Sequence, residues 1–266
     1  MQQKIELLSY EQKIKRSKYN AVFVHGFSSS HARHTEIFKA FKNDQINYYT
    51  FDLPGHGNNL LLDQDNKKQL KLELFSDLVV DFINQKQLDN VILIGHSMGG
   101  GICSVVNYLI PNKIKALILE APLNPSIYSF DKKRIVDSLK SFGFKSSLQK
   151  LSDEQTTNDQ ISLFSWLKKI YKDNKEKLPL FFNLLSTNAK QLLTNAYSAL
   201  NNKPVLLIFG ENDAVIPPHK SIEFISKFTN KLTTRIIDEA AHLPHLINKS
   251  LYYHFIKEFI DKLMIE

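Results

Sequence analysis

A serine lies at the junction between an apolar run and a glycine-rich segment. The run is Val-Ile-Leu-Ile at 91–94, and Gly-His-Ser-Met-Gly follows at 95–99. A hydroxyl is a poor nucleophile until a base and a fixed geometry activate it. Glycines two positions before and after Ser97 permit the tight turn that lifts a side chain off a sheet. Ser97 is therefore the candidate nucleophile, although this five-residue pattern also occurs in ordinary strand-to-helix loops.

A serine nucleophile needs a base, and the base needs a carboxylate that orients it. Both should follow strands, because the carboxyl ends of parallel strands meet at one edge of a sheet, where sites form. Asp213 comes after the apolar run 206–209, and His242 comes after the run 235–237. We therefore predict Asp213 as the acid and His242 as the base.

Other side chains compete for these two roles. The competing carboxylates are Glu120, Glu211 and Asp238. Glu120 is the main competitor, because it ends another predicted strand. His245 follows His242 by three residues, but it is farther from the strand end and a proline separates the two. His96, next to the nucleophile, is expected to point away from it and to be structural.

A tetrahedral intermediate also needs main-chain N–H donors. One predicted donor is Met98, the residue after the nucleophile. The other is Phe27 in His-Gly-Phe at 25–27, directly after the apolar run 22–24. Gly26 would let this loop approach a substrate closely.

Metal and nucleotide sites are not indicated. His31 and His34 are spaced like a ligand pair, but the sequence shows no cysteines or carboxylates that would converge on them. No Gly-x-Gly-x-x-Gly or Walker-type loop is present. We therefore expect no metal and no cofactor.

Short apolar runs alternate with segments of helical spacing. The predicted strands are residues 21–24, 48–51, 91–94, 116–119, 205–209 and 235–237. The predicted helices lie near 38–41 and over 74–83, 102–110, 222–228 and 251–263. This alternation indicates βαβ units and an α/β fold with a mostly parallel sheet flanked by helices. Residues 4–9 are interpreted as a leading antiparallel strand.

Residues 125–200 interrupt this rhythm. The segment has no convincing strand, and its leucines and aromatic residues have helix-like spacing. It is too long for a plain connection. We predict a helical lid at 125–200 that is inserted into a core formed by 1–124 and 201–266.

The composition narrows the function classes. The chain has 266 residues, is 43% hydrophobic, carries a formal charge of +7 and contains one cysteine, Cys103. A single cysteine cannot form an intramolecular disulfide, which suits a cytoplasmic location. No apolar run reaches the length of a membrane span. The lysines are spread along the chain, so we expect a solvated basic surface and no nucleic-acid binding. A weak peripheral association with anionic membranes stays open, and the oligomeric state is unknown.

These motifs together resemble the α/β-hydrolase superfamily over nearly the whole chain. The 25–27 segment is similar to the oxyanion loop of this superfamily. Asp-Leu-Pro-Gly-His-Gly at 52–57 is similar to the turn after the fourth strand of the superfamily. The 95–100 segment is similar to its nucleophile elbow, and Asp213 and His242 match its acid and base positions. The resemblance implies a lid between the sixth and seventh strands, where 125–200 falls.

Within the superfamily, the motifs resemble monoacylglycerol lipases and small carboxylesterases. Asn58 and Ala241 depart from the pattern, standing where relatives often have serine and glycine. The resemblance implies a serine hydrolase whose partner is a small-molecule ester. The aromatic and leucine content of the predicted lid favours an apolar acyl group, so lipid-like or medium-chain esters are the first expectation. The alternatives are a carbon–carbon bond hydrolase or peptidase with the same three residues, and a binding module of the same fold without catalysis.

Overall fold

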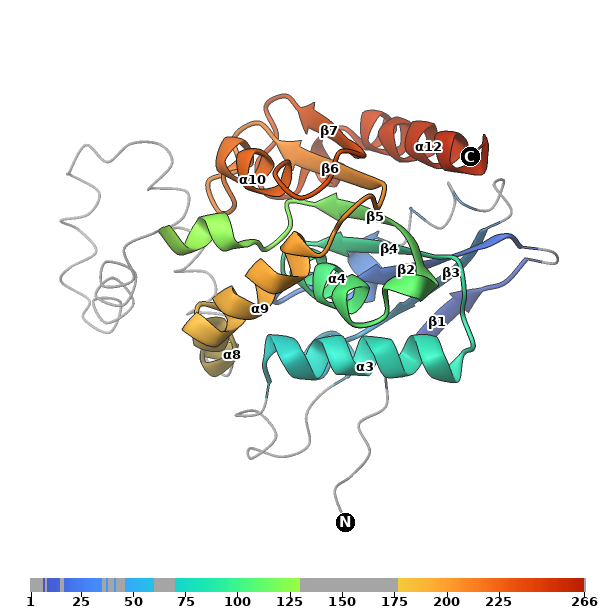
Figure 1. Ribbon diagram of the computed structural model, residues 1–266, viewed down its shortest axis with the longest axis horizontal. Coiled ribbons are helices and arrows are strands. Elements are labelled where there is room, and N and C mark those ends of the chain that lie inside the picture. Colours follow the sequence, from blue (N-terminus) through green and yellow to red (C-terminus); the bar gives the residue numbers. More distant parts are fainter. Residues whose placement is uncertain are drawn as a thin grey trace, which may run out of the picture.

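A seven-stranded sheet forms the centre of the molecule (Figure 1). The computed structural model describes residues 7, 9–14, 17–34, 37, 41, 46–59, 70–129 and 177–265. The strands are β1 (Ser9–Gln12), β2 (Tyr19–Val24), β3 (Ile46–Phe51), β4 (Val91–His96), β5 (Ile114–Glu120), β6 (Val205–Gly210) and β7 (Leu232–Ile237). Their order across the sheet is β1-β3-β2-β4-β5-β6-β7. Only the β1–β3 pair is antiparallel among these strands, so the predicted α/β fold with a mostly parallel sheet is confirmed.

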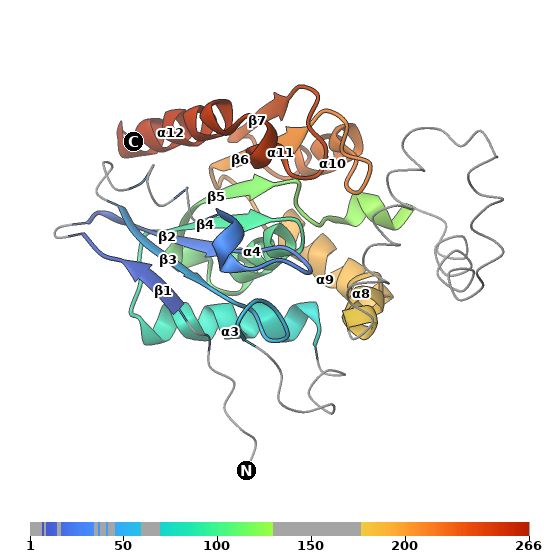
Figure 2. The same ribbon diagram turned by 180° about the vertical axis from the view of Figure 1, so that it is seen from behind.

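Helices cover both faces of this sheet (Figures 1 and 2). The longer ones are α3 (Leu72–Gln85), α4 (Met98–Leu109), α9 (Thr187–Ser198), α10 (Pro218–Ile225) and α12 (Lys249–Ile265). The short ones are η1 (His31–His34), η2 (Pro111–Lys113), η3 (Pro125–Ser129), α8 (Leu178–Leu184) and α11 (Pro244–Ile247). Helices α3, α4 and α9 pack on one face, while α12 packs on the other.

The strand sequences explain this two-sided packing. In β4, Val91 and Leu93 belong to the core on the α3–α4 face, whereas Ile92 and Ile94 belong to the core on the α12 face. Side chains of a strand alternate between faces, so a strand buried on both sides must be apolar at every position. For this reason, central strands such as β4 and β6 contain continuous apolar runs, which the sequence alone identifies as buried strands.

The leading strand differs from the prediction. It covers Ser9–Gln12 rather than 4–9, and residues 4–6 and 8 lie outside the described residues. Strand β1 is an edge strand of polar sequence, Ser-Tyr-Glu-Gln, with two exposed positions. Its hydrogen bonds to β3 define it, and hydrophobic patterning therefore could not locate it. Of the helix predicted near 38–41, only Phe41 is described, and it is buried.

The segment expected to form a lid lies between β5 and β6, the fifth and sixth strands of this sheet. Residues 130–176 are outside the described residues. The described part near its end packs on the α/β core, where the Tyr197 hydroxyl donates to the Leu123 carbonyl at 3.0 Å. The Asn183 amide of α8 also donates to the Leu70 carbonyl at 3.0 Å. Helices α8 and α9 therefore share the core of the main sheet.

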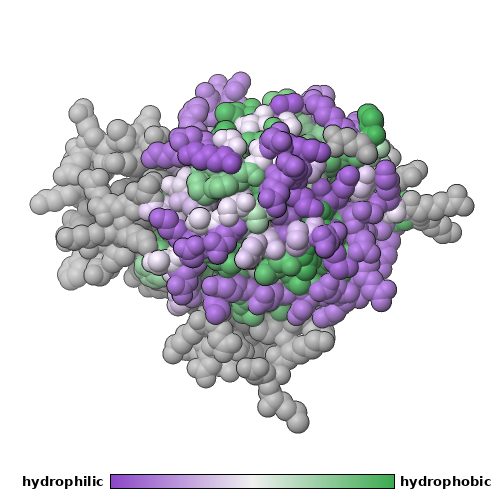
Figure 3. Space-filling view, in the orientation of Figure 1, coloured by the Kyte–Doolittle hydropathy of each residue, from purple (hydrophilic) through white to green (hydrophobic). Residues whose placement is uncertain are grey.

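The surface in the orientation of Figure 1 is mixed in character. Hydrophilic side chains are spread over this face, with smaller hydrophobic areas between them (Figure 3). Among the described helices, none combines the length and the apolar character that a bilayer span requires.

Candidate active site

Ser97 occupies a strained turn between β4 and α4. Its backbone has φ +54° and ψ −120°, a conformation that residues with a side chain rarely adopt. Its N–H donates to the Glu120 carbonyl at 2.9 Å, and its carbonyl accepts from the Leu123 N–H at 2.8 Å. The turn is also crowded, because a Cβ at Gly95 would lie 2.5 Å from the Gly99 carbonyl oxygen. Glycines and hydrogen bonds together hold the serine at the carboxyl edge of the sheet.

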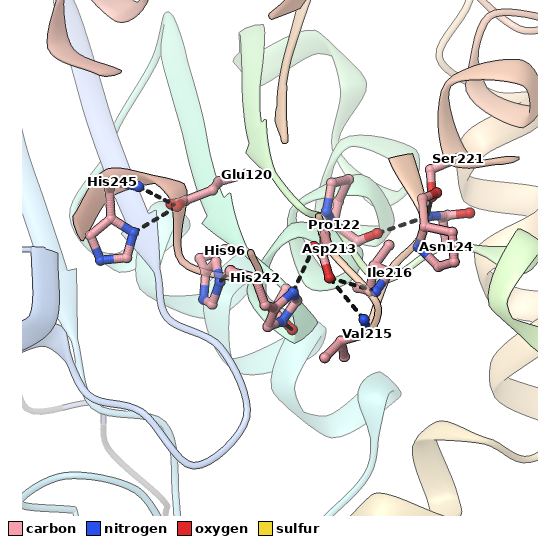
Figure 4. A network of polar contacts seen from close by, with 12 residues as sticks. His96, Glu120, Pro122, Asn124, Asp213, Val215, Ile216, Ser221, His242 and His245 are labelled. Atoms are coloured by element: carbon pink, nitrogen blue, oxygen red, sulfur yellow. Dashed lines mark hydrogen bonds and ion pairs between the residues drawn. The ribbon is translucent and has the colours of Figure 1, made fainter. Parts of the chain in front are cut away.

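His242 lies between Ser97 and Asp213. Its Nε2 is 3.0 Å from the Ser97 Oγ, and its Nδ1 is 2.8 Å from the Asp213 Oδ2. A carboxylate only accepts hydrogen bonds, so the Nδ1 carries the proton and the Nε2 is the acceptor for the serine hydroxyl. The structure therefore brings three residues from three different strand ends into one hydrogen-bonded row (Figure 4 shows the His242–Asp213 part).

The Asp213 carboxylate is fixed from its other side. Its Oδ1 accepts the main-chain N–H groups of Val215 and Ile216, each at 2.9 Å, and the residue is 3% exposed. Two main-chain donors on one oxygen leave the other oxygen aimed at the imidazole (Figure 4). Of the two main candidate acids, the structure places Asp213 on His242, whereas Glu120 receives His245 at 2.6 Å.

The His-Gly-Phe loop follows β2 and is held by its own histidine. The His25 Nδ1 donates to the Gly26 carbonyl at 2.8 Å, and its Nε2 accepts the Leu53 N–H at 3.0 Å. Burial lowers the pKa of His25 to about 4, so the ring is neutral near pH 7 and can fill both roles. The loop lies close to the nucleophile, because a Cβ at Gly26 would be 3.1 Å from the Ser97 Cβ.

The two predicted oxyanion donors remain available for a substrate. Within the described part of the chain, the N–H groups of Phe27 and Met98 have no hydrogen-bond partner. Met98 is the first residue of α4, where helical N–H groups have no partner inside the helix. Such donors, together with the helix dipole, favour a developing negative charge. Their role stays a prediction.

His96 contacts the loop that carries His242. Its Nε2 donates to the main-chain carbonyl of His242 at 2.9 Å, and the two rings have centroids 5.0 Å apart. Burial holds the pKa of His96 well below its ordinary value, which keeps the ring neutral. The structural role predicted for His96 therefore has a specific partner, the main-chain carbonyl of His242.

His31 and His34, considered as a ligand pair in the sequence, have separate partners. The His31 Nδ1 lies 3.0 Å from an Asp52 carboxylate oxygen, whereas the His34 Nε2 lies 3.1 Å from the Glu120 Oε2. Sequence spacing does not predict the contacts of His34 and His245 with Glu120, because these two histidines are 86 and 125 positions away from Glu120. The only available signal was that Glu120 ends a predicted strand.

The side chains of His34, Glu120 and His245 lie close enough together to be considered as ligands of one metal ion. Their ligand atoms lie within 4.8 Å of one another. The His245 Nδ1 and Glu120 Oε1 are 2.6 Å apart, however, a hydrogen-bond distance. Two ligands across one tetrahedral zinc ion are separated by about 3.3 Å, given zinc–ligand bonds of about 2.0–2.2 Å. The observed spacing is that of a hydrogen-bonded cluster.

Comparisons with known proteins agree with this fold. A family model described as serine aminopeptidase, S33 matches residues 15–246. The chain is 40% identical over 255 residues to the Mycoplasma genitalium protein named "Putative esterase/lipase 2", covering 94% of this chain and 92% of that protein. It is 35% identical over 252 residues to the Mycoplasma pneumoniae protein of the same name, covering 93% and 91%.

A solved structure shows the same architecture. The structure of an esterase from Exiguobacterium antarcticum aligns with a TM-score of 0.71 at 16% identity, covering 96% of this chain and 95% of that one. At this identity, the likeness concerns the fold alone.

Proposed function

The chain belongs to the serine aminopeptidase S33 family of α/β hydrolases, and from this premise we propose that it is a serine hydrolase of carboxylic esters. The observation that carries the proposal is the row Ser97–His242–Asp213, with separations of 3.0 and 2.8 Å. The two mycoplasma relatives, both named "Putative esterase/lipase 2", support the ester as the substrate class.

The proposed reaction uses each residue in one role. His242 removes the proton from the Ser97 hydroxyl as the oxygen attacks the ester carbonyl, and Asp213 stabilises the imidazolium that forms. The N–H groups of Phe27 and Met98 bind the oxyanion. The imidazolium then protonates the departing alcohol. Water, activated by His242, attacks the acyl-enzyme, releases the acid and restores the serine.

The acyl group is proposed to be apolar, of the lipid-like or medium-chain type. The ring of Phe27 meets that of Phe181 on α8, with centroids 6.1 Å apart in an edge-to-face arrangement. Phe181 is buried, and α8 lies near the end of the segment proposed as a lid, residues 125–200. Apolar side chains beside the predicted oxyanion donor favour an apolar substrate group, because burial of apolar surface stabilises the complex.

A peptidase is the second candidate function, because the matching family model is described as a serine aminopeptidase. The same three residues could also serve a carbon–carbon bond hydrolase, or remain in a binding module of this fold. The proposal further includes a cytoplasmic location, consistent with the single cysteine Cys103. Weak attraction to anionic membranes is proposed from the formal charge of +7.

Two measurements test the proposal. A fluorophosphonate probe should label wild-type protein at Ser97 and should not label Ser97→Ala, and an unlabelled wild type would favour a binding module. A panel of p-nitrophenyl esters of increasing acyl length is compared with an aminoacyl p-nitroanilide. Ester turnover that exceeds anilide turnover and increases toward medium chains supports the esterase. Turnover of the anilide alone would establish the peptidase instead.

A further inference from the structure

A buried polar cluster lies beside the row of Ser97, His242 and Asp213. Its members, called the Glu120 cluster below, are His34, Glu120, His245 and Tyr252, with exposed fractions of 2, 1, 5 and 0%. They come from four separate elements, namely η1, the end of β5, α11 and α12. The proposed reaction uses none of them. A buried carboxylate is costly unless it is paired and hydrogen-bonded, so the cluster needs an explanation.

The Glu120 carboxylate accepts hydrogen bonds at both oxygens. Its Oε1 receives the His245 Nδ1 at 2.6 Å and lies 3.4 Å from the His245 main-chain nitrogen. Its Oε2 receives the His34 Nε2 and the Tyr252 hydroxyl, each at 3.1 Å. Both the side chain and the main chain of His245 are therefore attached to the end of β5 (Figure 4).

The attachment matters because His242 lies on the short loop that leads directly into α11, and His245 is the second residue of that helix. This loop leaves β7 and enters α11, and its carbonyl at Ala240 accepts the Asn212 N–H at 2.8 Å. At His242 itself, the main-chain carbonyl accepts from the His96 Nε2. His96 and Glu120 are directly paired across β4 and β5. The two neighbouring strand ends thus hold this segment at two points, at the main chain of His242 itself and three residues later at His245. Figure 4 shows His96 and Glu120 beside these two residues.

We propose that Glu120 is a positioning residue for the reaction: by binding His245, it fixes the loop so that the His242 imidazole stays between Ser97 and Asp213. This inference rests on the proposed hydrolase function. The base must serve the serine in one step and water in the next, and a displacement of about 1 Å in such geometry costs about 100-fold in rate. A cluster that served stability alone would have no need to hold this particular loop.

The charge state of the cluster is compatible with this role. Burial by itself raises the pKa of the Glu120 carboxyl, but the adjacent His245 and the hydrogen bonds from His245 and His34 outweigh this effect. The net effect holds the pKa of Glu120 well below its ordinary value. The carboxylate is therefore ionised at neutral pH and remains an acceptor for all its donors.

The test begins with wild-type enzyme and p-nitrophenyl butyrate as the substrate. Fluorophosphonate labelling at Ser97 is measured first, because a wild type without labelling would refute the hydrolase and not this inference. In Glu120→Ala, we expect kcat to fall about 10- to 100-fold with KM within about twofold, and labelling to slow in parallel. Glu120→Gln keeps an oxygen that can accept from His245, and should recover most of the lost kcat.

A second pair of variants covers the case in which Glu120→Ala does not fold. His245→Ala removes the side-chain donor, whereas His245→Asn retains an N–H at a similar position, so the first should lose more kcat than the second. Tyr19→Phe is the matched control for lost stability. It removes a buried hydroxyl that donates to the Leu263 carbonyl at 3.2 Å, on the α12 face, outside the cluster.

A third measurement follows the hydrogen bond between His242 and Asp213 directly by NMR. The proton on the His242 Nδ1, hydrogen-bonded to Asp213, gives a low-field NMR signal that should broaden or vanish in the alanine variants and remain in Tyr19→Phe. The inference is overturned if labelled, folded Glu120→Ala or His245→Ala retains the wild-type kcat and this signal. It is also overturned if Tyr19→Phe, at equal loss of thermal stability, loses kcat to the same extent.

Discussion

The main-chain N–H of Ser97 donates to the main-chain carbonyl of Glu120 at 2.9 Å. The side chain of the same glutamate binds His245 of α11, the helix that directly follows the loop of the proposed base. One residue at the end of β5 therefore contacts both the turn that carries the hydroxyl and the helix that follows the loop carrying the imidazole. Because parallel strand ends share an edge, this link spans two segments that are far apart in the sequence.

Ser97→Ala should abolish ester turnover, with a loss on the order of a million-fold in kcat. The change removes only a hydroxyl and leaves the backbone at φ +54° as strained as before. Steady-state kinetics and a thermal unfolding curve measure both effects. Ser76→Ala is the control, because it removes a buried hydroxyl on α3 that bonds to the Leu72 carbonyl. Turnover retained by Ser97→Ala would assign the nucleophile elsewhere.

Asp213→Asn should lower kcat by about 10⁴-fold. The amide oxygen would continue to accept from Val215 and Ile216, so the NH₂ group would face the His242 Nδ1. That nitrogen would have to become an acceptor, which moves its proton to Nε2 and blocks proton transfer from the serine. Asp238→Asn is the control: its side chain is exposed, so this variant should keep the wild-type kcat. A larger loss in Glu120→Gln than in Asp213→Asn would show that the acid is misassigned.

Gly26→Ala should lower kcat by about 100-fold, comparable to the loss of one oxyanion donor. A Cβ at this position would lie 2.8 Å from the His96 Nδ1, so the loop that carries the Phe27 N–H must shift. The expected signature is a fall in kcat with little change in KM. Ser30→Ala in the same loop should leave both constants nearly unchanged. Wild-type kcat in Gly26→Ala would remove Phe27 from the oxyanion site.

Acid should destabilise the fold between about pH 6.5 and pH 4. The pKa of buried His25 is about 4 in the folded chain, against about 6.5 in an unfolded one. In this window the unfolded state binds more protons, so stability falls as the pH falls, by about 3 kcal/mol from this residue. Denaturant unfolding at several pH values gives the slope. His25→Gln should make this slope less steep, whereas His254→Gln at an exposed site should leave it unchanged.

Cys103 should be unreactive in the folded protein. The thiol is fully buried on α4, and burial raises its pKa, so little thiolate is present. Iodoacetamide should modify it only after unfolding, to one group per chain, as mass spectrometry can show. Rapid modification of the native protein at a rate independent of denaturant would contradict the packing of α4 against the sheet.

The local features of this protein could be predicted from its sequence. Strands β2, β4, β5 and β6 contain continuous apolar runs because parallel strands inside a sheet are buried on both faces, and their ends are marked by glycine and polar residues. The turn at Ser97 requires glycines at both sides. The candidates Ser97, Asp213 and His242 followed from their positions after strand ends, since such positions share an edge in any parallel sheet.

Only the tertiary structure decided which side chains meet. Hydrophobic patterning assigns a residue to a face of a strand but carries no information about its neighbours across the sheet. It therefore left Glu120 and Asp213 as rivals, and the folded chain directs Asp213 to His242 and Glu120 to His245. Edge strand β1, polar in sequence, likewise depends on its hydrogen bonds to β3. Partners separated by 29 to 145 residues are brought together by packing, which no local pattern encodes.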